Sequence, residues 1–430
     1  MKKVLIITYY WPPAGGAGVQ RVLKFAKYLP QFGWQPIILT VENPDCPVID
    51  ETLLNDIPEA CKIYKTKSLE PFEFYKKISG KKKGEKIPSD ILMNDKNLSL
   101  IQKFSKWVRV NLFIPDAKIG WKYYAIKIGL EIIKNEKIDL IFSTSPPQTP
   151  ALIAKTLAQK TKLKWIADFR DPWMEIVHYQ NLKRNPLTKF IDSRLEKSVL
   201  ENATSLITIS SDIINLFHSK VENKKINLIP NGFDETDFKE TEFAENKIFT
   251  IAYTGVLTKS RVPITFLKSL NKLIFEDKVQ NIKLVFAGKT CPEFDEEIEK
   301  NKLRNYYEQR GFLPHHESTN ILQTSDTLLL IIDDVPNNKG FLTGKIFEYL
   351  GTKKPIFAIG PTDGNANDIL NETSSGKMVD YNDEESTYSL LKEMYNNWLN
   401  KSFNFTYKVD QYSRKGLTKK LAEIFNEHLT

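Results

Sequence analysis

The sequence is poor in the residues that cross-link a chain or anchor it in a bilayer. It has three cysteines among 430 residues, and they lie far apart, at Cys46, Cys61 and Cys291. This spacing fits neither a disulfide framework nor a cysteine-based metal site, and we expect a reducing, cytoplasmic setting. The apolar runs fall short of the roughly 18 residues that a transmembrane helix requires. The two lysines after Met1 precede only a short apolar run, so we expect no signal peptide.

Acidic residues are fewer than basic ones. There are 53 Asp and Glu against 61 Lys and Arg, which gives a formal net charge of +8. Part of the excess lies in Lys76–Lys86, where six lysines accompany one glutamate. Such a run is typical of a solvated loop. It could also contact the anionic face of the inner membrane, where each basic residue contributes about 1 kcal/mol. No nucleic-acid-binding motif stands beside it, so we expect no nucleic-acid partner.

The length of the chain predicts two domains. In both halves, short apolar runs such as Val4–Thr8 alternate with stretches whose apolar residues recur at helical spacing. This alternation predicts an α/β fold with a doubly wound parallel sheet in each domain and a ligand cleft between them. We place the domains at residues 1–235 and 248–400. The polar stretch Asp234–Lys247 is the expected linker, and a helix within 401–430 is expected to cross back to the first domain.

Three further stretches carry local expectations. Gly311–Leu313 is predicted to be a short strand, and about Leu390–Phe425 is predicted to be a helical tail. The amphipathic, aromatic stretch Leu100–Phe113 is expected to pack on its own domain. The alternative for this stretch is a surface that grips a lipid-linked acceptor or the membrane interface.

Residues that suit a ligand follow two predicted strands of the first domain. Gly15 and Gly16 follow the first strand, where glycine lets the backbone approach a phosphate or a sugar closely. Asp168, Arg170 and Asp171 follow a later strand, and two carboxylates with a guanidinium at a strand end are typical of a substrate site. The alternatives are a tight structural turn for the glycines and an ion pair that closes the next helix for the charged residues.

The second domain contains a stretch that suits a nucleotide. Thr343 and Gly344 end a loop, and the apolar residues after them recur at helical spacing. The free N–H groups and partial positive charge of a helix start favour a phosphate. Glu348, about one turn later, could accept hydrogen bonds from both hydroxyls of a ribose. Gly255 follows the first strand of this domain. The alternative is an ordinary amphipathic helix with a solvated glutamate.

In their order and spacing, several segments resemble the retaining nucleotide-sugar glycosyltransferases of family four, which have the GT-B fold. These segments are Tyr10–Pro13 with Gly15–Gly18, Ile229–Asp234, Tyr253–Gly255, Gly311–Pro314 and Lys345–Leu350. The resemblance covers nearly the whole chain. It implies two Rossmann-like domains, with the donor nucleotide held mainly by the C-terminal one.

The resemblance also implies roles for individual residues. Glu348 matches the glutamate that binds the ribose hydroxyls, and Thr343 and Gly344 match the loop whose backbone contacts the diphosphate. Gly16 matches the N-terminal loop that faces the diphosphate and the acceptor. Arg261 stands at the position of a lysine that neutralises the diphosphate.

The chain departs from the family pattern at several positions. Gly340 replaces a glutamate that orients the donor sugar, and Val256 replaces an arginine that neutralises the diphosphate. Lys259 or Lys345 could supply the missing charge. Many relatives have His-Asp where this chain has Arg170-Asp171.

These features predict retaining transfer of a sugar from a nucleoside-diphosphate sugar to a saccharide or lipid-linked saccharide acceptor. The family resemblance suggests capsule, O-antigen or exopolysaccharide assembly. Arg261 and Lys345 would stabilise the leaving diphosphate, and Asp168 or Asp171 could orient the acceptor. We expect no metal or other cofactor. The alternatives are a nucleotide-sugar epimerase of the same fold and a non-catalytic nucleotide-binding scaffold, which the departures at Gly340 and Val256 would suit.

Overall fold

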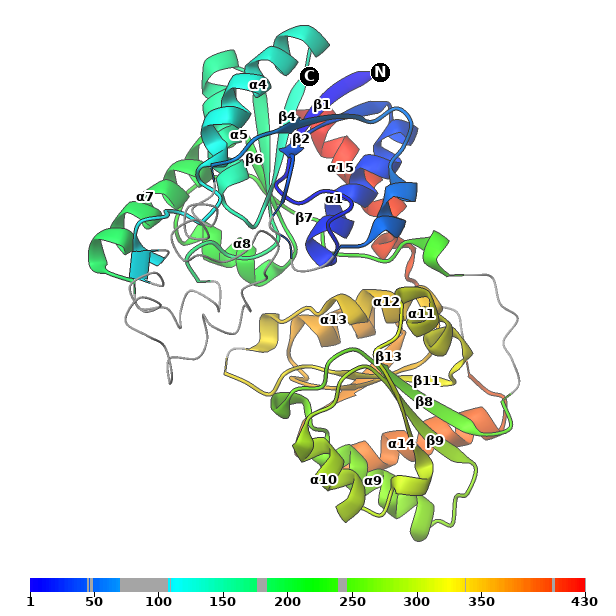
Figure 1. Cartoon of the computed structure of the whole chain (residues 1–430). Coiled ribbons are helices and arrows are strands. Elements are labelled where there is room, and N and C mark those ends of the chain that lie inside the picture. The colour runs from blue at the N-terminus through cyan, green and yellow to red at the C-terminus, as the bar shows by residue number, and fades with distance from the viewer. Residues whose placement is uncertain are drawn as a thin grey trace, which may run out of the picture. The chain divides into compact units, whose positions relative to one another are not determined.

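The computed structural model describes residues 1–44, 46, 49–69, 107–108, 110–175, 184–238, 246–336, 338–403 and 407–429. The lysine run Lys76–Lys86 and much of Leu100–Phe113 lie outside these residues. The chain forms two compact units (Figure 1): unit 1 comprises Met1–Pro230 and Thr418–Thr430, and unit 2 comprises Asn231–Leu417. The chain therefore enters unit 2 at Asn231 and returns to unit 1 at Thr418. The predicted first domain ended at 235, the second was placed at 248–400, and the return was expected within 401–430.

Unit 1 contains a parallel sheet that has seven strands among the described residues. The strands are β1 (Lys2–Ile7), β2 (Trp34–Val41), β3 (Lys62–Thr66), β4 (Leu140–Ser145), β5 (Lys164–Phe169), β6 (Ser205–Thr208) and β7 (Ile226–Leu228). Across the sheet their order is β3-β2-β1-β4-β5-β6-β7. The helices are α1 (Ala17–Tyr28), α4 (Trp121–Glu136), α5 (Thr149–Thr161), α7 (Pro186–Asn202), α8 (Ser211–His218) and α15 (Arg414–Glu427), which begins in unit 2.

Helices cover both faces of this sheet, which explains why its central strands are apolar on both sides. Trp121 of α4 and Leu157 of α5 belong to the core on one face. On the other face, Phe25 of α1 and Phe425 of α15 pack edge-on against Phe142 of β4, with ring centroids 6.2 and 5.6 Å apart. Figure 1 shows α1 beside α15, so the last helix of the chain completes the unit that the first strand begins.

Unit 2 contains a second parallel sheet, with six strands among the described residues. The strands are β8 (Phe249–Thr254), β9 (Ile282–Ala287), β10 (Tyr307–Gly311), β11 (Thr327–Ile331), β12 (Ile356–Ile359) and β13 (Gly376–Val379), in the spatial order β10-β9-β8-β11-β12-β13. The helices are α9 (Ile264–Phe275), α10 (Pro292–Lys300), α11 (His315–Thr324), α12 (Gly344–Thr352), α13 (Asn365–Thr373) and α14 (Glu384–Leu399). One core joins the sheet to α9, α10 and α14, and another joins it to α11, α12 and α13.

Short 3-10 helices occur in the connections of both units. They are η1 (Leu29–Phe32), η2 (Glu51–Asp56), η4 (Glu235–Asp237), η5 (Lys259–Arg261), η6 (Arg304–Tyr306), η7 (Asn338–Gly340) and η8 (Asp410–Tyr412).

Each sheet has a point at which the strand order reverses. In unit 1 the chain runs outward from β1 to β2 and β3 and resumes on the other side of β1 at β4; in unit 2 the same happens between β8 and β11. The loops that follow such neighbouring strands diverge at the carboxyl edge of the sheet, and open α/β sheets bind their ligands there. The fold therefore points to one position in each unit.

Two local predictions differ from the structure in their bounds. The strand expected at Gly311–Leu313 lies earlier, at Tyr307–Gly311, because Gly311 takes a left-handed conformation with φ +64° that ends it. The tail predicted as helical over Leu390–Phe425 is two helices, α14 and α15. Asn400 ends α14, and Lys401 with φ 51° turns the chain away.

Candidate functional site

A close approach of two segments defines the carboxyl edge of the unit 2 sheet. β8 ends at Thr254, and Gly255 follows it with φ +109°. A Cβ at Gly255 would lie 2.7 Å from Cε of Lys345, a residue in the first turn of α12. The absent side chain, and a backbone conformation that L side chains rarely adopt, thus let the aliphatic part of Lys345 lie against this turn.

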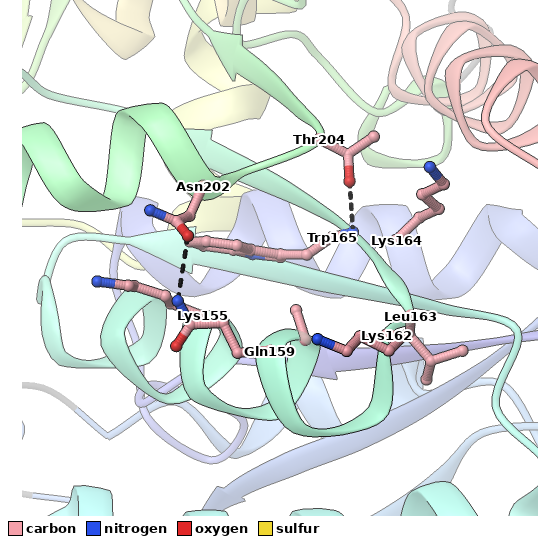
Figure 2. A pocket seen from close by; sticks show the side chains of 9 residues that line it. Lys155, Gln159, Lys162, Leu163, Lys164, Trp165, Asn202 and Thr204 are labelled. Atoms are coloured by element: carbon pink, nitrogen blue, oxygen red, sulfur yellow. Dashed lines mark hydrogen bonds between the residues drawn. The ribbon is translucent and has the colours of Figure 1, made fainter.

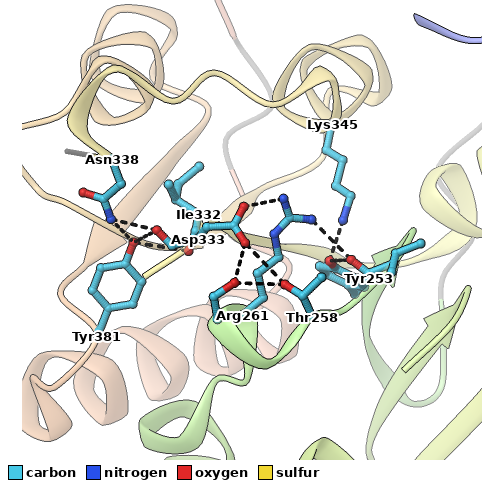
Figure 3. A network of polar contacts seen from close by, with 10 residues as sticks. Tyr253, Thr258, Arg261, Ile332, Asp333, Asn338, Lys345 and Tyr381 are labelled. Carbon is cyan, nitrogen blue, oxygen red and sulfur yellow. Dashed lines mark hydrogen bonds and ion pairs between the residues drawn. The ribbon is translucent and has the colours of Figure 1, made fainter. Parts of the chain in front are cut away.

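Lys345 is held against an aromatic ring beneath this edge. Its ammonium donates to the Tyr253 hydroxyl at 2.5 Å and lies 3.8 Å from the centroid of the ring (Figure 3). The Tyr253 hydroxyl in turn donates to the carbonyl of Val256 at 3.0 Å. Burial, and then the nearby Arg261 guanidinium, lower the pKa of Lys345 to about 7. This group can therefore change its charge near neutral pH.

Arg261 and Asp333 form the second part of the site. Arg261 Nη2 lies 2.5 Å from Asp333 Oδ2, and Nη1 donates to the Val256 carbonyl at 3.2 Å. The Ser260 hydroxyl donates to the other carboxylate oxygen at 2.7 Å. Burial alone would raise the pKa of Asp333, but the hydrogen bonds from Arg261 and Ser260 outweigh it and lower that pKa. Each side chain of the pair keeps 19% of its surface exposed.

Two further residues fix the chain after β11. Asn338 Nδ2 donates to the Asp333 carbonyl at 2.8 Å and to the Tyr381 hydroxyl at 2.9 Å (Figure 3). The Tyr381 hydroxyl lies 3.2 Å from the Ile332 carbonyl and 3.1 Å from that of Asp333. These bonds hold the backbone that carries Asp333, and so they determine where its carboxylate meets Arg261.

The start of α12 lies next to these cations in sequence and in space. Thr343 is its N-cap, but the side chain makes no capping hydrogen bond, and its buried Oγ1 has no partner among the described residues. Gly344 is exposed, and a Cβ there would meet nothing within 4 Å. Glu348 is partly exposed and lies three residues after Lys345, so the two share one face of the helix. The helix therefore presents an open N-terminus, a cation and a carboxylate.

Lys259, the other candidate cation, is mostly solvated. It lies in η5 with 81% of its side chain exposed and pairs with Glu293 at 3.3 Å. An exposed pair of this kind is weak and can exchange for another anion at little cost.

The carboxyl edge of the unit 1 sheet is built differently. Arg21 of α1 is 0% exposed, and its Nη2 lies 2.7 Å from one Asp168 oxygen. Its Nε and the Thr144 hydroxyl donate to the other oxygen at 3.1 and 2.8 Å. Arg21 also donates to the carbonyls of Ile229 and Pro230, both at 2.8 Å. The expected contact between Asp168 and an acceptor therefore lacks support, because this carboxylate is enclosed and fully engaged.

Arg170 is likewise occupied by the backbone. Its Nε donates to the Ser145 carbonyl at 3.1 Å, and its two Nη atoms donate to the carbonyls of Gly18 and Pro146. Its guanidinium thus joins the loop after β4 to the start of α1, and we assign it to holding that loop. Asp171 is partly exposed.

The glycine loop of unit 1 remains open. Gly15 is partly exposed, and Gly16 is exposed with φ +102° as the N-cap of α1. A Cβ at Gly16 would meet nothing within 4 Å, although the positive φ would strain a larger residue. Among the predicted residues of unit 1, Gly15, Gly16, Arg170 and Asp171 are at least partly exposed, and the Arg170 guanidinium is engaged by backbone carbonyls.

The structure brings together the predicted residues Gly255, Arg261, Gly344 and Lys345 of unit 2, so one ligand could contact all of them. Sequence reasoning missed the residues that position them, namely Tyr253, Asp333, Asn338 and Tyr381. Asp168 is the last residue but one of β5, and Asp333 lies two residues after β11. Both are carboxylates near the end of a buried strand, so the signal used for Asp168 was also present for Asp333.

A shallow cavity of about 230 Å³ lies elsewhere, at the amino end of β5 (Figure 2). Lys155, Gln159, Lys162, Trp165 and Asn202 are among its lining residues, and it includes none of the predicted site residues. Helices α5 and α7 end near this cavity, and the lysines there compensate the negative ends of helices.

Within the described part of the chain, no helix is long and apolar enough to cross a membrane. The same residues contain no group of three or more His, Cys, Asp and Glu side chains placed to hold a metal ion.

Comparisons with known proteins agree with this architecture. Residues 96–237 match the family model Glycosyltransferase Family 4. The structure resembles Anabaena HepE in complex with UDP and glucose, at 11% identity and a TM-score of 0.58, over 99% of this chain and 100% of the other. It also resembles the lipopolysaccharide outer core galactosyltransferase WaaB, at 11% identity and a TM-score of 0.57, with the same coverage. No match was found among curated protein sequences.

A third similar structure has a different activity. The putative UDP-N-acetylglucosamine 2-epimerase of Listeria monocytogenes aligns over 99% of this chain and 98% of its own, at 11% identity and a TM-score of 0.54. At such identities these likenesses show the fold, and the predicted two-unit α/β architecture of the GT-B type is confirmed. Together with the family match, the fold supports a glycosyltransferase of the GT-B type.

Proposed function

We propose that the protein transfers a sugar from a nucleoside-diphosphate sugar to an acceptor hydroxyl with retention of anomeric configuration. The observation that carries this proposal is the group at the β8/β11 reversal, where Lys345, Arg261 and the open start of α12 occur together. Two cations and a helix N-terminus are suited to a diphosphate, which carries two or more negative charges.

The donor is proposed to bind along α12. Its phosphates accept hydrogen bonds from the backbone at Thr343 and Gly344, whose N-terminal position leaves N–H groups available. The buried Thr343 Oγ1, which has no partner among the described residues, is a further donor. Glu348 accepts from the ribose hydroxyls one helical turn later.

The chemistry then requires no protein nucleophile. The bond between the anomeric carbon and the leaving phosphate oxygen breaks, and negative charge grows on the diphosphate. Arg261 and Lys345 stabilise this charge more strongly than that of the ground state, which lowers the barrier. The acceptor oxygen attacks from the same face, and its proton passes to the departing phosphate. We propose that these cations neutralise the leaving diphosphate without the help of a metal ion.

Asp333 is proposed to orient the cationic side of this site. Its ion pair with Arg261 fixes the guanidinium and offsets part of its charge, so binding does not depend on an uncompensated buried cation. On the acceptor side we propose the loop at Gly15 and Gly16 together with Asp171, because the geometry leaves these residues of unit 1 accessible.

The biological setting is proposed from the family-four resemblance. A saccharide or lipid-linked saccharide acceptor, in the assembly of a bacterial surface polysaccharide, would suit an enzyme that works in the cytoplasm at the inner face of the membrane. Solved structures with the same fold include a lipopolysaccharide galactosyltransferase, in keeping with this setting.

A thermal-shift panel of nucleoside diphosphates tests the donor site. One of these ligands should raise the melting temperature of the wild type by mass action. The same ligand should shift Glu348→Ala much less, and Glu385→Ala, at an exposed glutamate of α14, should respond like the wild type. If no nucleotide shifts the wild type at millimolar concentration, the donor site is refuted.

Product analysis separates transfer from epimerisation, the activity of one structure with the same fold. A transferase that receives a matching sugar donor releases the nucleoside diphosphate, whereas an epimerase leaves sugar and nucleotide joined and changes one stereocentre. Nuclear magnetic resonance of the sugar distinguishes these products. A donor that binds without either change over hours would favour the non-catalytic scaffold.

A further inference from the structure

The first two turns of helix α7 in unit 1 have their apolar side chains turned outward, whereas Val199 and Leu200 near the end of the helix are buried in the core. Leu187, Phe190 and Ile191 lie on one face at helical spacing and are 67%, 58% and 38% exposed. The opposite face carries Asp192 and Glu196, which are 0% and 2% exposed. Most surface helices show the reverse arrangement, with apolar residues inward and charges outward.

Buried bonds fix the helix in this rotation. Asp192 accepts from Trp173 Nε1 at 2.8 Å and from Arg184 Nη2 at 2.6 Å. Glu196 accepts from Lys220 Nζ at 2.8 Å. Turning α7 to hide its apolar face would leave these buried partners unsatisfied, at a cost of several kcal/mol. The exposure of the apolar face is therefore built into the unit.

A second segment enlarges this face. The Asn111 side chain accepts a hydrogen bond from the backbone N–H of Asn185 at 2.7 Å. The backbone carbonyl of Asn111 accepts one from the Thr188 hydroxyl at 3.0 Å. These bonds place the segment that carries Trp107 and Leu112, which are 47% and 62% exposed, beside the start of α7. Figure 1 shows this short segment at one end of α7. The stretch Leu100–Phe113 was expected to pack on its own domain. In its described part Asn111 is buried against α7, while the Trp107 and Leu112 side chains are exposed.

Among the described residues of α7, the exposed charged side chains beside this apolar patch are cations. Lys189 and Arg194 are exposed beside it, and the Arg194 guanidinium lies 5.0 Å from the centroid of Phe190. The carboxylates Asp192 and Glu196 point to the interior and are already paired. The surface thus combines aromatic and aliphatic side chains with cations, as helices that lie in the interface of an anionic bilayer do.

We propose that the apolar patch, defined as Trp107, Leu112, Leu187, Phe190 and Ile191, docks on the surface of an anionic lipid bilayer. Its apolar side chains enter the boundary between headgroups and acyl chains, and Lys189 and Arg194 contact the lipid phosphates. α7 follows β5, so its first turns lie towards the carboxyl edge of the unit 1 sheet. Where the proposed function holds, this docking brings a lipid-linked acceptor to the edge that carries Gly16 and Asp171.

Vesicle co-sedimentation of the full chain without nucleotide tests the docking. The wild type should bind vesicles that contain phosphatidylglycerol, with weaker binding in high salt, and should bind phosphatidylcholine vesicles far less. The double variant Leu187→Ser/Phe190→Ser should bind anionic vesicles about tenfold more weakly or less. The double variant Phe275→Ser/Leu399→Ser is the matched control, because both residues are exposed in unit 2, at 47% and 56%. It should bind like the wild type.

Charge variants and the oligomeric state complete the test. Lys189→Gln and Arg194→Gln should each weaken binding to anionic vesicles about fivefold. The proposal is overturned if the wild type stays in the supernatant with anionic vesicles. It is also overturned if the patch variant keeps its melting temperature and sediments with these vesicles as the wild type does. Sedimentation velocity that shows a dimer which the patch variant dissociates overturns it as well, because the patch then joins two copies. No donor is present, so failure here is distinct from failure of the donor site.

Discussion

At the carboxyl edge of the unit 1 sheet, the side chains of Arg21 and Asp168 are completely enclosed. At the corresponding edge of unit 2, the side chains of Arg261 and Asp333 each remain 19% exposed. Both pairs join an arginine to an aspartate that follows or ends a buried strand, and both lie beside the reversal of strand order. The difference lies in what else each arginine contacts and in what solvent can reach.

The enclosed pair shows that charge at a strand end is not by itself evidence of a site. Removing an arginine and an aspartate from water is costly, and the structure compensates with three donors to Asp168 and two carbonyls to Arg21. This network closes the part of the unit 1 edge around Asp168. The accessible pair in unit 2 can exchange part of its interactions for a ligand's charge, as a binding site requires.

The largest expected effect is on stability, from breaking the enclosed pair. Asp168→Ala leaves the Arg21 charge buried and uncompensated and should lower the free energy of unfolding by about 3–5 kcal/mol. Asp333→Ala should lower it by about 1 kcal/mol or less, because solvent screens that pair. Urea denaturation followed by circular dichroism measures both. Equal losses in the two variants would remove the distinction between the edges.

Much of the fold was predictable, because strand and helix patterns in this chain are strong. The continuous apolar run at Val4–Ile7 could only be a strand covered on both faces, and it is. The break in the tail between α14 and α15 was not predictable, because the apolar spacing continues across a turn that the conformation of Lys401 creates. Only the structure shows that Asp192 and Glu196 of α7 occupy the interior.

The candidate site was predictable only in part. Gly255, Arg261 and Lys345 come from the family resemblance and lie together, but Asn338 and Tyr381 carry no pattern that marks them. Asp168 and Asp333 follow the same sequence rule, yet one is enclosed and the other accessible. The deciding factor is the partner: Arg21, 147 residues away in sequence, reaches Asp168 through the fold. A local pattern cannot contain such information.

The second prediction concerns binding at the accessible edge. Lys345→Met keeps the length and packing of the side chain and removes its charge, so the affinity for the nucleoside diphosphate should fall about 10- to 100-fold. Stability should change little. Lys377→Met, at an exposed lysine of β13 that pairs with Glu393, is the control and should bind normally. Isothermal titration calorimetry measures the affinities, and unchanged binding by Lys345→Met would remove this lysine from the site.

The third prediction uses the pH dependence of the same lysine. Its pKa of about 7 means that it is mainly charged below neutral pH and mainly neutral above. A diphosphate favours the charged form, so affinity should be high in acid and fall about tenfold between about pH 6 and about pH 8. Lys345→Met should lose this component and retain only the titration of the phosphate. If the affinities of the wild type and of Lys345→Met change with pH to the same extent, Lys345 does not titrate between about pH 6 and about pH 8.

The smallest expected effect comes from the carboxylate that accompanies Arg261. Asp333→Asn keeps an acceptor for the Ser260 hydroxyl but removes the charge that opposes a diphosphate, so affinity should rise by a factor of about three to five. The same change loosens the Arg261 guanidinium, and a looser cation stabilises the growing charge less well in the transition state. Turnover should therefore fall while KM also falls. Steady-state kinetics with the donor found in the binding panel measures both. If KM and kcat of Asp333→Asn do not both fall, Asp333 neither opposes the diphosphate nor positions Arg261 for turnover. The accessible pair would then have only a structural role, as the enclosed pair does.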